Sequence, residues 1–285
     1  MTVLHRALLG ALILFGMLLS DAAQAQTVSK EDFRINDENT ITTVGDQEAP
    51  DVAASLGGYT VVWKDTRGVD SDIYAQLFDS RGGAKGLTLK INNSPAGVFK
   101  GLPRVARHFP EGAIGDPFGT SVVVWQDGRQ DAQGDIYAQL YNNTSATFIG
   151  SNFRVDDAPS GAQQAPAVGM WPTAAGFVVV WADRRNGNDD IYARFFQGNG
   201  NPAGASFRVN NDTGQQNQSS PDVAMGPGGE IVVVWRDFRN TQTGISEIYA
   251  QRYLSNGSPV GGNFRVDSLV VGAVTPRVEI AGDGS

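Results

Sequence analysis

Residues 181–196 read WADRRNGNDDIYARFF, and close copies of this stretch occur three more times along the chain. The copies are WKDTRGVDSDIYAQLF from Trp63, WQDGRQDAQGDIYAQLY from Trp125 and WRDFRNTQTGISEIYAQRY from Trp235. Each one keeps Trp-x-Asp-x-Arg and then, after an acidic residue, Ile-Tyr-Ala. The Trp residues are spaced by 62, 56 and 54 positions. Self-similarity at this period is typical of a repeat protein.

Three other segments recur around each copy. The runs YTVVW, SVVVW, FVVVW and IVVVW end at the four Trp residues, and Pro-x-Val segments start at Pro50, Pro103, Pro166, Pro221 and Pro276. Segments of the type FRVN start at Phe33, Phe153, Phe207 and Phe264, with the weaker LKIN at Leu89. Reading one unit as FRVN, PxVA, VVVW and IYAQ gives units of roughly 31–86, 87–149, 150–203 and 204–260, with a partial unit at 261–285.

These segments have the composition of short β-strands. They are rich in Val, Ile, Phe and Tyr and are bounded by Gly, Asn, Pro or Asp. The VVVW runs are apolar at every position, which predicts a strand buried on both faces. Four strands in each unit of about 55 residues predict an all-β fold, a β-propeller-like array of four-stranded antiparallel blades. A tandem array of β-sandwich modules is the alternative, although such modules need about 90–100 residues each.

The VVVWxDxR…DIYAQ…FRVN repeats resemble those of bacterial secreted or periplasmic β-propeller proteins, broadly of the TolB-like kind. The resemblance covers about residues 31–285. It implies an extracytoplasmic role in binding a protein or a glycan, and it supplies no catalytic residue. The Ser-x-Asp-x-Gly-x-Thr-Trp box of sialidase-type propellers is absent from the sequence.

The N-terminus has the pattern of an export signal. His5 and Arg6 precede an apolar run over 7–19, and Ala23-Gln24-Ala25 supplies the small-x-small cleavage pattern. We therefore expect a signal peptide at 1–25, a repeat domain at 26–285, and a secreted, periplasmic or cell-surface protein. An uncleaved anchor is the alternative; after cleavage no integral membrane segment is expected.

Composition excludes several classes of site and partner. The chain has no Cys, and only one of its two His lies after the signal, which excludes disulfides and Cys- or His-rich metal sites. Its net charge is -8, so no nucleic-acid partner is expected. Five Pro-x-Val segments accompany only four Trp-x-Asp-x-Arg loops. We expect a fragment of a larger protein; the alternative is a native end at which 264–285 closes a ring of four or five blades irregularly.

Repetition favours scaffolding over catalysis for the Trp-x-Asp-x-Arg loops, because an active site is normally single. Acid–base or anion-binding chemistry is the functional alternative for the Asp/Arg pairs, and sugar stacking is the alternative for the repeated Trp and Tyr. The expected structural motif consists of Trp63, Asp65, Arg67, Trp125, Asp127, Arg129, Trp181, Asp183, Arg185, Trp235, Asp237 and Arg239. The acid density of the loops also suggests calcium, with Asp65, Asp72, Asp127, Asp135, Asp183 and Asp190 as weak candidate ligands.

Function is expected where the units differ. The insertion 107–119 and the segment around Trp171 are specific to single units, and they suggest a binding rim of His108, Phe109, Phe118 and Trp171. No catalytic residue and no cofactor other than possible calcium is expected. The preferred function is a non-catalytic binding or structural module for a protein or glycan. The alternatives are an inert spacer and a propeller-type hydrolase or lyase with one channel site, which unmatched carboxylates from single blades would favour.

Overall fold

The computed structural model of the chain describes residues 35, 45–55, 57–67, 70–108, 119–171, 176–240, 245–268 and 275–280. The chain divides into two units, Met1–Ile35 and Asn36–Ser285, and every described strand belongs to the second unit. The predicted signal peptide, the FRIN segment at Phe33 apart from Ile35, and the predicted rim residues Phe109 and Phe118 lie outside the described residues.

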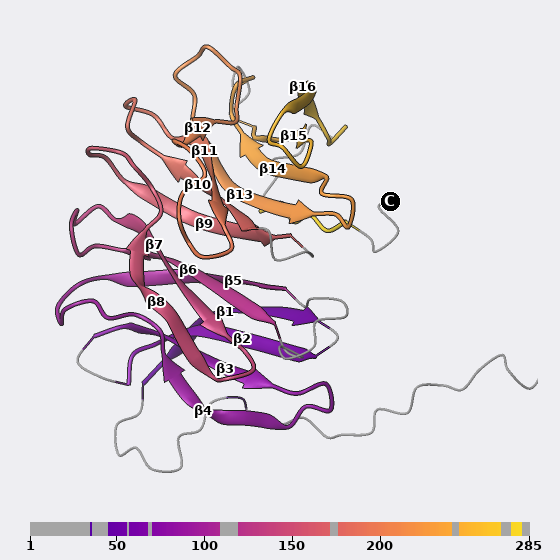
Figure 1. The fold of residues 1–285 in the computed structure, drawn as a ribbon. Coiled ribbons are helices and arrows are strands. Elements are labelled where there is room, and N and C mark those ends of the chain that lie inside the picture. Colours follow the sequence, from indigo (N-terminus) through magenta and orange to yellow (C-terminus); the bar gives the residue numbers. More distant parts are fainter. Residues whose placement is uncertain are drawn as a thin grey trace, which may run out of the picture. The chain divides into compact units, whose positions relative to one another are not determined.

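Among the described residues, sixteen β-strands form four sheets, each with four antiparallel strands in chain order (Figure 1). The prediction of an all-β, propeller-like array of four-stranded blades is confirmed. The first sheet contains β1 (Gln47–Ser55), β2 (Gly58–Asp65), β3 (Asp72–Phe78) and β4 (Ala84–Lys90); the second contains β5 (Lys100–His108), β6 (Thr120–Asp127), β7 (Asp135–Asn142) and β8 (Thr147–Arg154). The third contains β9 (Gln163–Met170), β10 (Gly176–Asp183), β11 (Asp190–Gln197) and β12 (Phe207–Arg208); the fourth contains β13 (Gln218–Met225), β14 (Ile231–Asp237), β15 (Glu247–Tyr253) and β16 (Pro259–Arg265).

The sheets begin one strand later than the units expected from the sequence. The FRVN-type segment is the last strand of the preceding sheet, where Arg154 pairs with Tyr137 and Arg265 pairs with Tyr249. The expected boundaries at 86/87, 149/150 and 260/261 therefore cut through β4, β8 and β16. The physical reason is that short turns after the IYAQ strands return the chain directly against them as a hairpin.

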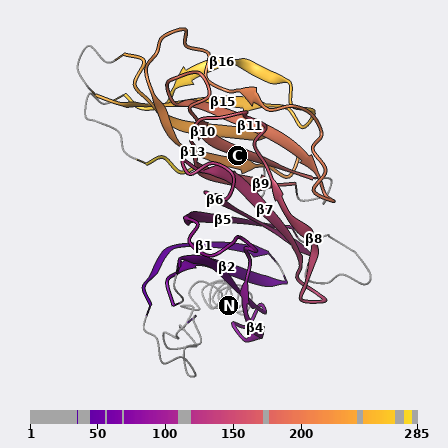
Figure 2. The same cartoon turned by 90° about the vertical axis from the view of Figure 1, so that its left-hand side faces the viewer.

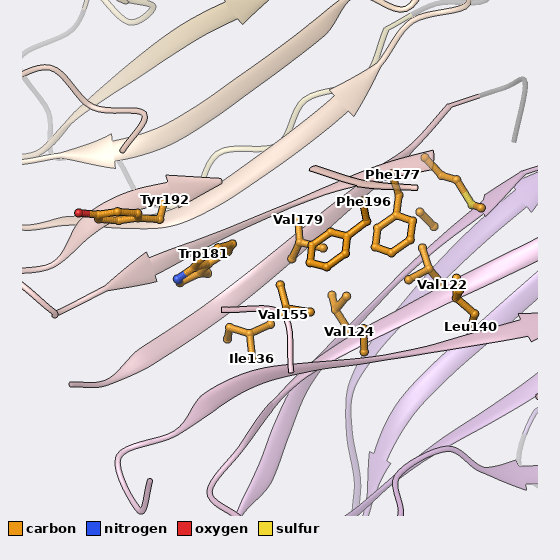
Figure 3. Close-up of a cluster of buried hydrophobic side chains, with 13 residues drawn as sticks. Val122, Val124, Ile136, Leu140, Val155, Phe177, Val179, Trp181, Tyr192 and Phe196 are labelled. Carbon is orange, nitrogen blue, oxygen red and sulfur yellow. The ribbon is translucent and has the colours of Figure 1, made fainter. Parts of the chain in front are cut away.

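Neighbouring sheets bury their apolar faces against each other. The strand β6 divides its side chains by parity: Val122 and Val124 pack towards the third sheet, whereas Val123 and Trp125 pack towards the first. The cluster between the second and third sheets is drawn in Figure 3, where Trp181 lies beside Ile136 and Val155. A third cluster joins the third and fourth sheets. The VVVW strands are thus buried on both faces over most of their length, as predicted. Three of the four clusters join two sheets, whereas the fourth, which contains Val61, Trp63 and Phe78, lies within the first sheet.

A hydrogen-bonded lock closes the hairpin between β10 and β11. The Trp181 indole N–H donates to Asp183 Oδ2 at 2.8 Å, and the backbone N–H of Arg185 donates to Asp183 Oδ1 at 2.9 Å. The Arg185 guanidinium binds the same carboxylate at 2.6 Å and lies 4.1 Å from the ring centroid of Tyr192. Tyr192 in turn pairs with Trp181 across the strands, with ring centroids 6.5 Å apart.

The same lock forms in the other three sheets. The indole N–H to carboxylate distances there are 3.0 Å for Trp63 and Asp65, 2.8 Å for Trp125 and Asp127, and 2.7 Å for Trp235 and Asp237. All four Asp side chains are fully buried and also bind the following Arg. A buried carboxylate is tolerated because several donors, one of them cationic, surround each one.

Replacing Asp183 by Ala should destabilise the fold strongly. The change leaves the Trp181 N–H and the Arg185 guanidinium without their shared acceptor, so the free energy of unfolding should fall by ~3–5 kcal/mol. Urea denaturation measures this fall. The matched control is Arg184→Lys in the same loop, which keeps a cation beside the buried Asp189; the Arg184 side chain is 49% exposed and pairs with Asp189 at 3.1 Å. The control substitution should change the free energy of unfolding by less than about 0.5 kcal/mol. Similar losses of stability in both variants would contradict the proposed contribution of the lock to stability.

Candidate functional site

In the first and third sheets, the second acid of the loop is held by an Asn at the end of the FRVN-type segment. The backbone N–H of Ile73 donates to Asn92 at 2.7 Å, and that of Ile191 donates to Asn210 at 2.8 Å. The amide groups of Asn92 and Asn210 then donate to Asp72 and Asp190, at 2.9 and 2.8 Å. One Asn thus satisfies both a strand N–H and a loop carboxylate.

The second sheet has Asp156 where the first and third sheets have Asn. Asp156 still accepts the Ile136 N–H, at 2.9 Å, but two carboxylates now face each other and Arg154 bridges them at 2.6 Å on both sides. Burial, and then the charge of Asp156, raise the pKa of Asp135 to about 6. Burial also raises the pKa of Asp156. The fourth sheet repeats this arrangement, with Arg265 between Glu247 and Asp267.

The six weak calcium candidates are all bound either in a Trp-x-Asp-x-Arg lock or in an ion pair of the second acid of a loop. Asp65, Asp127 and Asp183 bind Trp and Arg, whereas Asp72, Asp135 and Asp190 pair with Lys or Arg. Among the described residues, no group of three or more His, Cys, Asp or Glu is arranged to hold a metal ion. Calcium stays a prediction of the sequence, and these contacts add nothing to it.

The described part of the predicted binding rim does not gather at one place. His108 ends β5 in the second sheet and is buried. Trp171 follows β9 in the third sheet and is half-buried, with its ring 5.9 Å from that of Phe195. These two residues occupy the same position in the repeat, five residues after the Pro of Pro-x-Val. They therefore belong to equivalent places on different sheets.

A repeated bulge shapes the first strand of every sheet. The register shifts where β1, β5, β9 and β13 reach their Pro-x-Val segments. The residue before each Pro has a left-handed backbone, with φ of 49° at Ala49 and 51° at Leu102, Ala165 and Ser220. A left-handed non-glycine residue costs on the order of 1 kcal/mol, so packing of the whole unit must hold it in place. Such bulges re-aim the side chains that follow them.

The residue after the Pro is Asp51 in the first sheet and Arg104 in the second. The backbone N–H of Val105 donates to Asp51 Oδ2 at 2.9 Å, and Arg104 pairs with Asp51 Oδ1 at 3.4 Å. Because β5 is an edge strand, an N–H that bonds outside its own sheet lies on the open edge. The first strands of the four sheets, β1, β5, β9 and β13, follow one another along one side of the array, and we call this side the innermost edge (Figures 1 and 2). The Asp51 carboxylate therefore lies at the innermost edge.

The fourth sheet repeats this arrangement with the segment that follows it. The backbone N–H of Val278 donates to Asp222 Oδ2 at 3.0 Å, and Arg277 lies 4.0 Å from Asp222 Oδ1. Burial raises the pKa of Asp222, and the positive charges of Arg277 and Arg104 oppose this rise. Arg104 thus forms an ion pair with Asp51 and has a longer-range electrostatic effect on Asp222. In the third sheet the equivalent residue is Ala167, which adds no polar group.

Asp51 and Asp222 were not among the residues singled out by the sequence. The frame of Pro-x-Val was recognised, but the identity of x was not used as a signal. Across the five segments x is Asp, Arg, Ala, Asp and Arg. A position that varies in charge inside a constant frame, next to a strand edge, was the signal that would have identified both acids.

No protein-family model matches the chain, and no curated protein matches it either. Solved structures of similar fold include an α-L-arabinofuranosidase from Podospora anserina in complex with cellotriose, at 13% identity and TM-score 0.47, covering 80% of this chain and 70% of that one. The catalytic domain of a Coprinopsis cinerea α-L-arabinofuranosidase has 14% identity and TM-score 0.46, covering 78% and 68%. An endo-arabinase from Bacteroides thetaiotaomicron has 17% identity and TM-score 0.47, covering 77% and 78%. The resemblance to TolB-like repeats stays a prediction.

The expectation of a non-catalytic binding or structural module does not match the descriptions of these three proteins, whose likeness to the chain shows the fold alone. The three proteins of similar fold are all glycoside-cleaving enzymes by description. These descriptions name the same class of protein as the alternative expected from the sequence, a propeller-type hydrolase. Within the part of the chain that is described, no helix is long and apolar enough to cross a membrane.

Replacing Asp156 by Asn should stabilise the protein at neutral pH. Asn keeps the acceptor for Ile136 and adds a donor for Asp135, as Asn92 does for Asp72. The raised pKa of Asp135 means that the folded state binds its proton more tightly than the unfolded state, so this group makes stability fall as pH rises from about 4 to 6. The variant should gain on the order of 1 kcal/mol at pH 7. It should weaken the pH dependence without abolishing it, because burial is the larger cause of the raised pKa of Asp135. Thermal unfolding from pH 4 to pH 8 measures both effects.

The reciprocal variant Asn210→Asp is the matched control in the third sheet. It places a new carboxylate against Asp190 and Asp212, which Asn210 now contacts at 2.8 and 2.6 Å. This variant should be less stable than the wild type at pH 7, and its stability should recover as the pH falls. A loss of stability in Asp156→Asn at pH 7 would show instead that the Arg154-bridged pair of carboxylates is the more stable arrangement.

Proposed function

We propose that the chain is an exported propeller-type glycoside hydrolase whose reacting groups are Asp51 and Asp222. The observation that carries the proposal is their placement. Both follow the bulge of the first strand of a sheet, and they come from the first and fourth sheets alone. Arg104 pairs with Asp51, and its charge also opposes the rise in the pKa of Asp222. The contact occurs in the first and fourth sheets, whereas the second and third sheets have Arg104 and Ala167 at the same position, so it is not part of every unit as the Trp-x-Asp-x-Arg locks are.

Asp222 has the properties of the proton donor. Burial raises its pKa, so its carboxyl group holds a proton at higher pH than an exposed Asp does. Glycosidic cleavage needs such a group, because the departing sugar oxygen must gain a proton as its bond to the anomeric carbon breaks. Arg277 and Arg104 limit the rise in pKa, which keeps the group able to exchange its proton during turnover.

Asp51 has the properties of the partner carboxylate. It lies beside the Arg104 guanidinium at 3.4 Å and accepts the Val105 N–H, which fixes its orientation. In the proposed step it takes a proton from water while the water oxygen attacks the anomeric carbon on the face opposite the departing group. One proton leaves the water and another reaches the departing sugar, so the step consumes one water for each bond cleaved.

The small side chain of Ala167 leaves room for a substrate at the innermost edge. At the same strand position, Asp51, Arg104 and Asp222 are all long enough to fill the innermost edge, whereas Ala167 ends at a methyl group. Arabinose-containing polysaccharides are the first substrates to test, because the enzymes of similar fold are described as arabinofuranosidases and an arabinase. Export through the N-terminal segment 1–25 would bring the enzyme to such extracellular polymers.

The variants Asp51→Asn and Asp222→Asn test the proposal. Each Asn can still accept the backbone N–H that its Asp accepts, so the fold should persist while proton transfer is lost. Release of reducing sugar from arabinan and arabinoxylan should fall by about 10²–10⁴-fold in each variant. The matched control is Glu48→Gln on the same strand, β1, where Glu48 pairs with Lys64 at 2.9 Å on the surface; it should keep full activity.

The dependence on pH gives an independent check. Activity should fall on the alkaline side as Asp222 loses its proton, and this limb should lie above the range of an exposed Asp because burial raises the pKa of Asp222. Unchanged activity in both Asn variants would overturn the proposal and leave Asp51 and Asp222 as contacts between sheets. The same conclusion would follow if the purified protein released no sugar from any polysaccharide tested.

A further inference from the structure

A cleft of about 480 Å³ opens between the third and fourth sheets. One wall comes from the end of β11 and from Trp171, and the other comes from two turns of the fourth sheet, one between β13 and β14 and one between β15 and β16. Its size lies within the range of small-molecule sites. Neither Asp51 nor Asp222 lines it, so it is distinct from the proposed reacting site.

Two half-buried aromatic rings form one wall of the cleft. The rings of Trp171 and Phe195 have centroids 5.9 Å apart and planes tilted by 32°. Behind them, Phe207 stacks on Phe195 at 5.7 Å and holds it in place. This pair is specific to the third sheet: the equivalent pairs are Ser55 and Leu77, His108 and Leu140, and Gly226 and Arg252.

Trp171 differs from the four repeated Trp residues in its polar contacts. Each repeated indole N–H donates to a buried Asp. Among the residues that the structure describes, the Trp171 indole N–H has no hydrogen-bond acceptor. Trp171 therefore offers both a ring face and a donor, at a position where the scaffold requires neither.

The opposite wall is formed by backbone turns that are already closed. Gly229 N–H donates to the Gly226 carbonyl at 3.0 Å, and Gly257 N–H donates to the Leu254 carbonyl at 2.9 Å. Gly228 and Gly229 line the cleft without side chains, which leaves the space in front of the aromatic wall open. Because hydrogen bonds fix these turns, little ordering is needed when a ligand enters.

The polar groups of the cleft are all neutral. Gln197, Ser255 and Asn256 place amide and hydroxyl groups around the aromatic wall, and no described lining residue carries a charge. The lining is otherwise apolar, so the cleft suits a ligand with an apolar face and a rim of neutral hydrogen-bonding groups. A sugar ring has both: its C–H groups can lie on an aromatic face while its hydroxyls reach the amides.

We propose that this cleft binds one or two units of a neutral glycan chain, as a binding site separate from the reacting site. The inference rests on the cleft itself and does not depend on Asp51 or Asp222. Binding here would hold a polymer on the protein between cleavage events. Phosphorylated or acidic sugars are disfavoured, because no cation lines the cleft to offset the loss of their hydration.

Affinity electrophoresis in gels that contain soluble neutral xylan or β-glucan tests the proposal, with polygalacturonate as the acidic comparison. The protein should be retarded by at least one neutral polymer and less by the acidic one. Trp171→Ala should weaken this binding about tenfold or more. Phe148→Ala is the matched control, because Phe148 is an exposed aromatic of β8 outside the cleft; it should bind as the wild type does.

A second variant keeps the test decisive if Trp171→Ala folds poorly. Ala203 is exposed and lines the cleft, so Ala203→Phe should fill the cleft without removing a packed ring. It should abolish retardation while circular dichroism shows an unchanged β fold. Asp222→Asn should retain full retardation, which separates failure of the cleft proposal from failure of the proposed hydrolase.

Tryptophan fluorescence gives a direct readout of the site. The four repeated Trp side chains are at most 3% exposed, so acrylamide should quench Trp171 preferentially. Xylo- or cello-oligosaccharides should protect this signal in the wild type. Two results would overturn the proposal: no retardation by any neutral polymer, or wild-type binding by both Trp171→Ala and Ala203→Phe.

Discussion

The buried carboxylate of each Trp-x-Asp-x-Arg loop is the interaction on which the fold depends most. In the third sheet, Asp183 Oδ2 accepts from the indole of Trp181 and also binds the guanidinium of Arg185. Trp181 then contributes its ring to the cluster between the second and third sheets, so a polar contact within one hairpin determines the packing between sheets. A carboxylate with fewer donors could not stay buried, because the cost of losing water would exceed the gain.

The sequence predicted much of this fold because repetition multiplies a weak local signal. One VVVW run is ambiguous, but four runs in the same frame indicate one kind of strand. The predicted units begin one strand too early. Spacing along the chain does not say whether the strand at Phe153 pairs with the preceding or the following segment. Pairing is decided by the turn at 143–146, which closes β7 and β8 into a hairpin.

The candidate site was harder to predict, for a physical reason that Asp51 and Asp222 illustrate. Each is an ordinary acid after a Pro, and 171 residues separate them along the chain. Only the stacking of sheets brings their strands to one edge, where Arg104 acts on both. Trp171 was easier to find, because a Trp outside the repeat is visible in the sequence, but its partner Phe195 needed the structure.

The repeated strain before each Pro suggests how such a scaffold acquires a site. Ala49, Leu102, Ala165 and Ser220 all adopt the same left-handed backbone, although the residues that follow the Pro differ in charge. The bulge is therefore a property of the unit and does not depend on the side chain it re-aims. Substitutions at the residue after the Pro can change the chemistry of the innermost edge, while the locks and the VVVW strands hold each sheet unchanged.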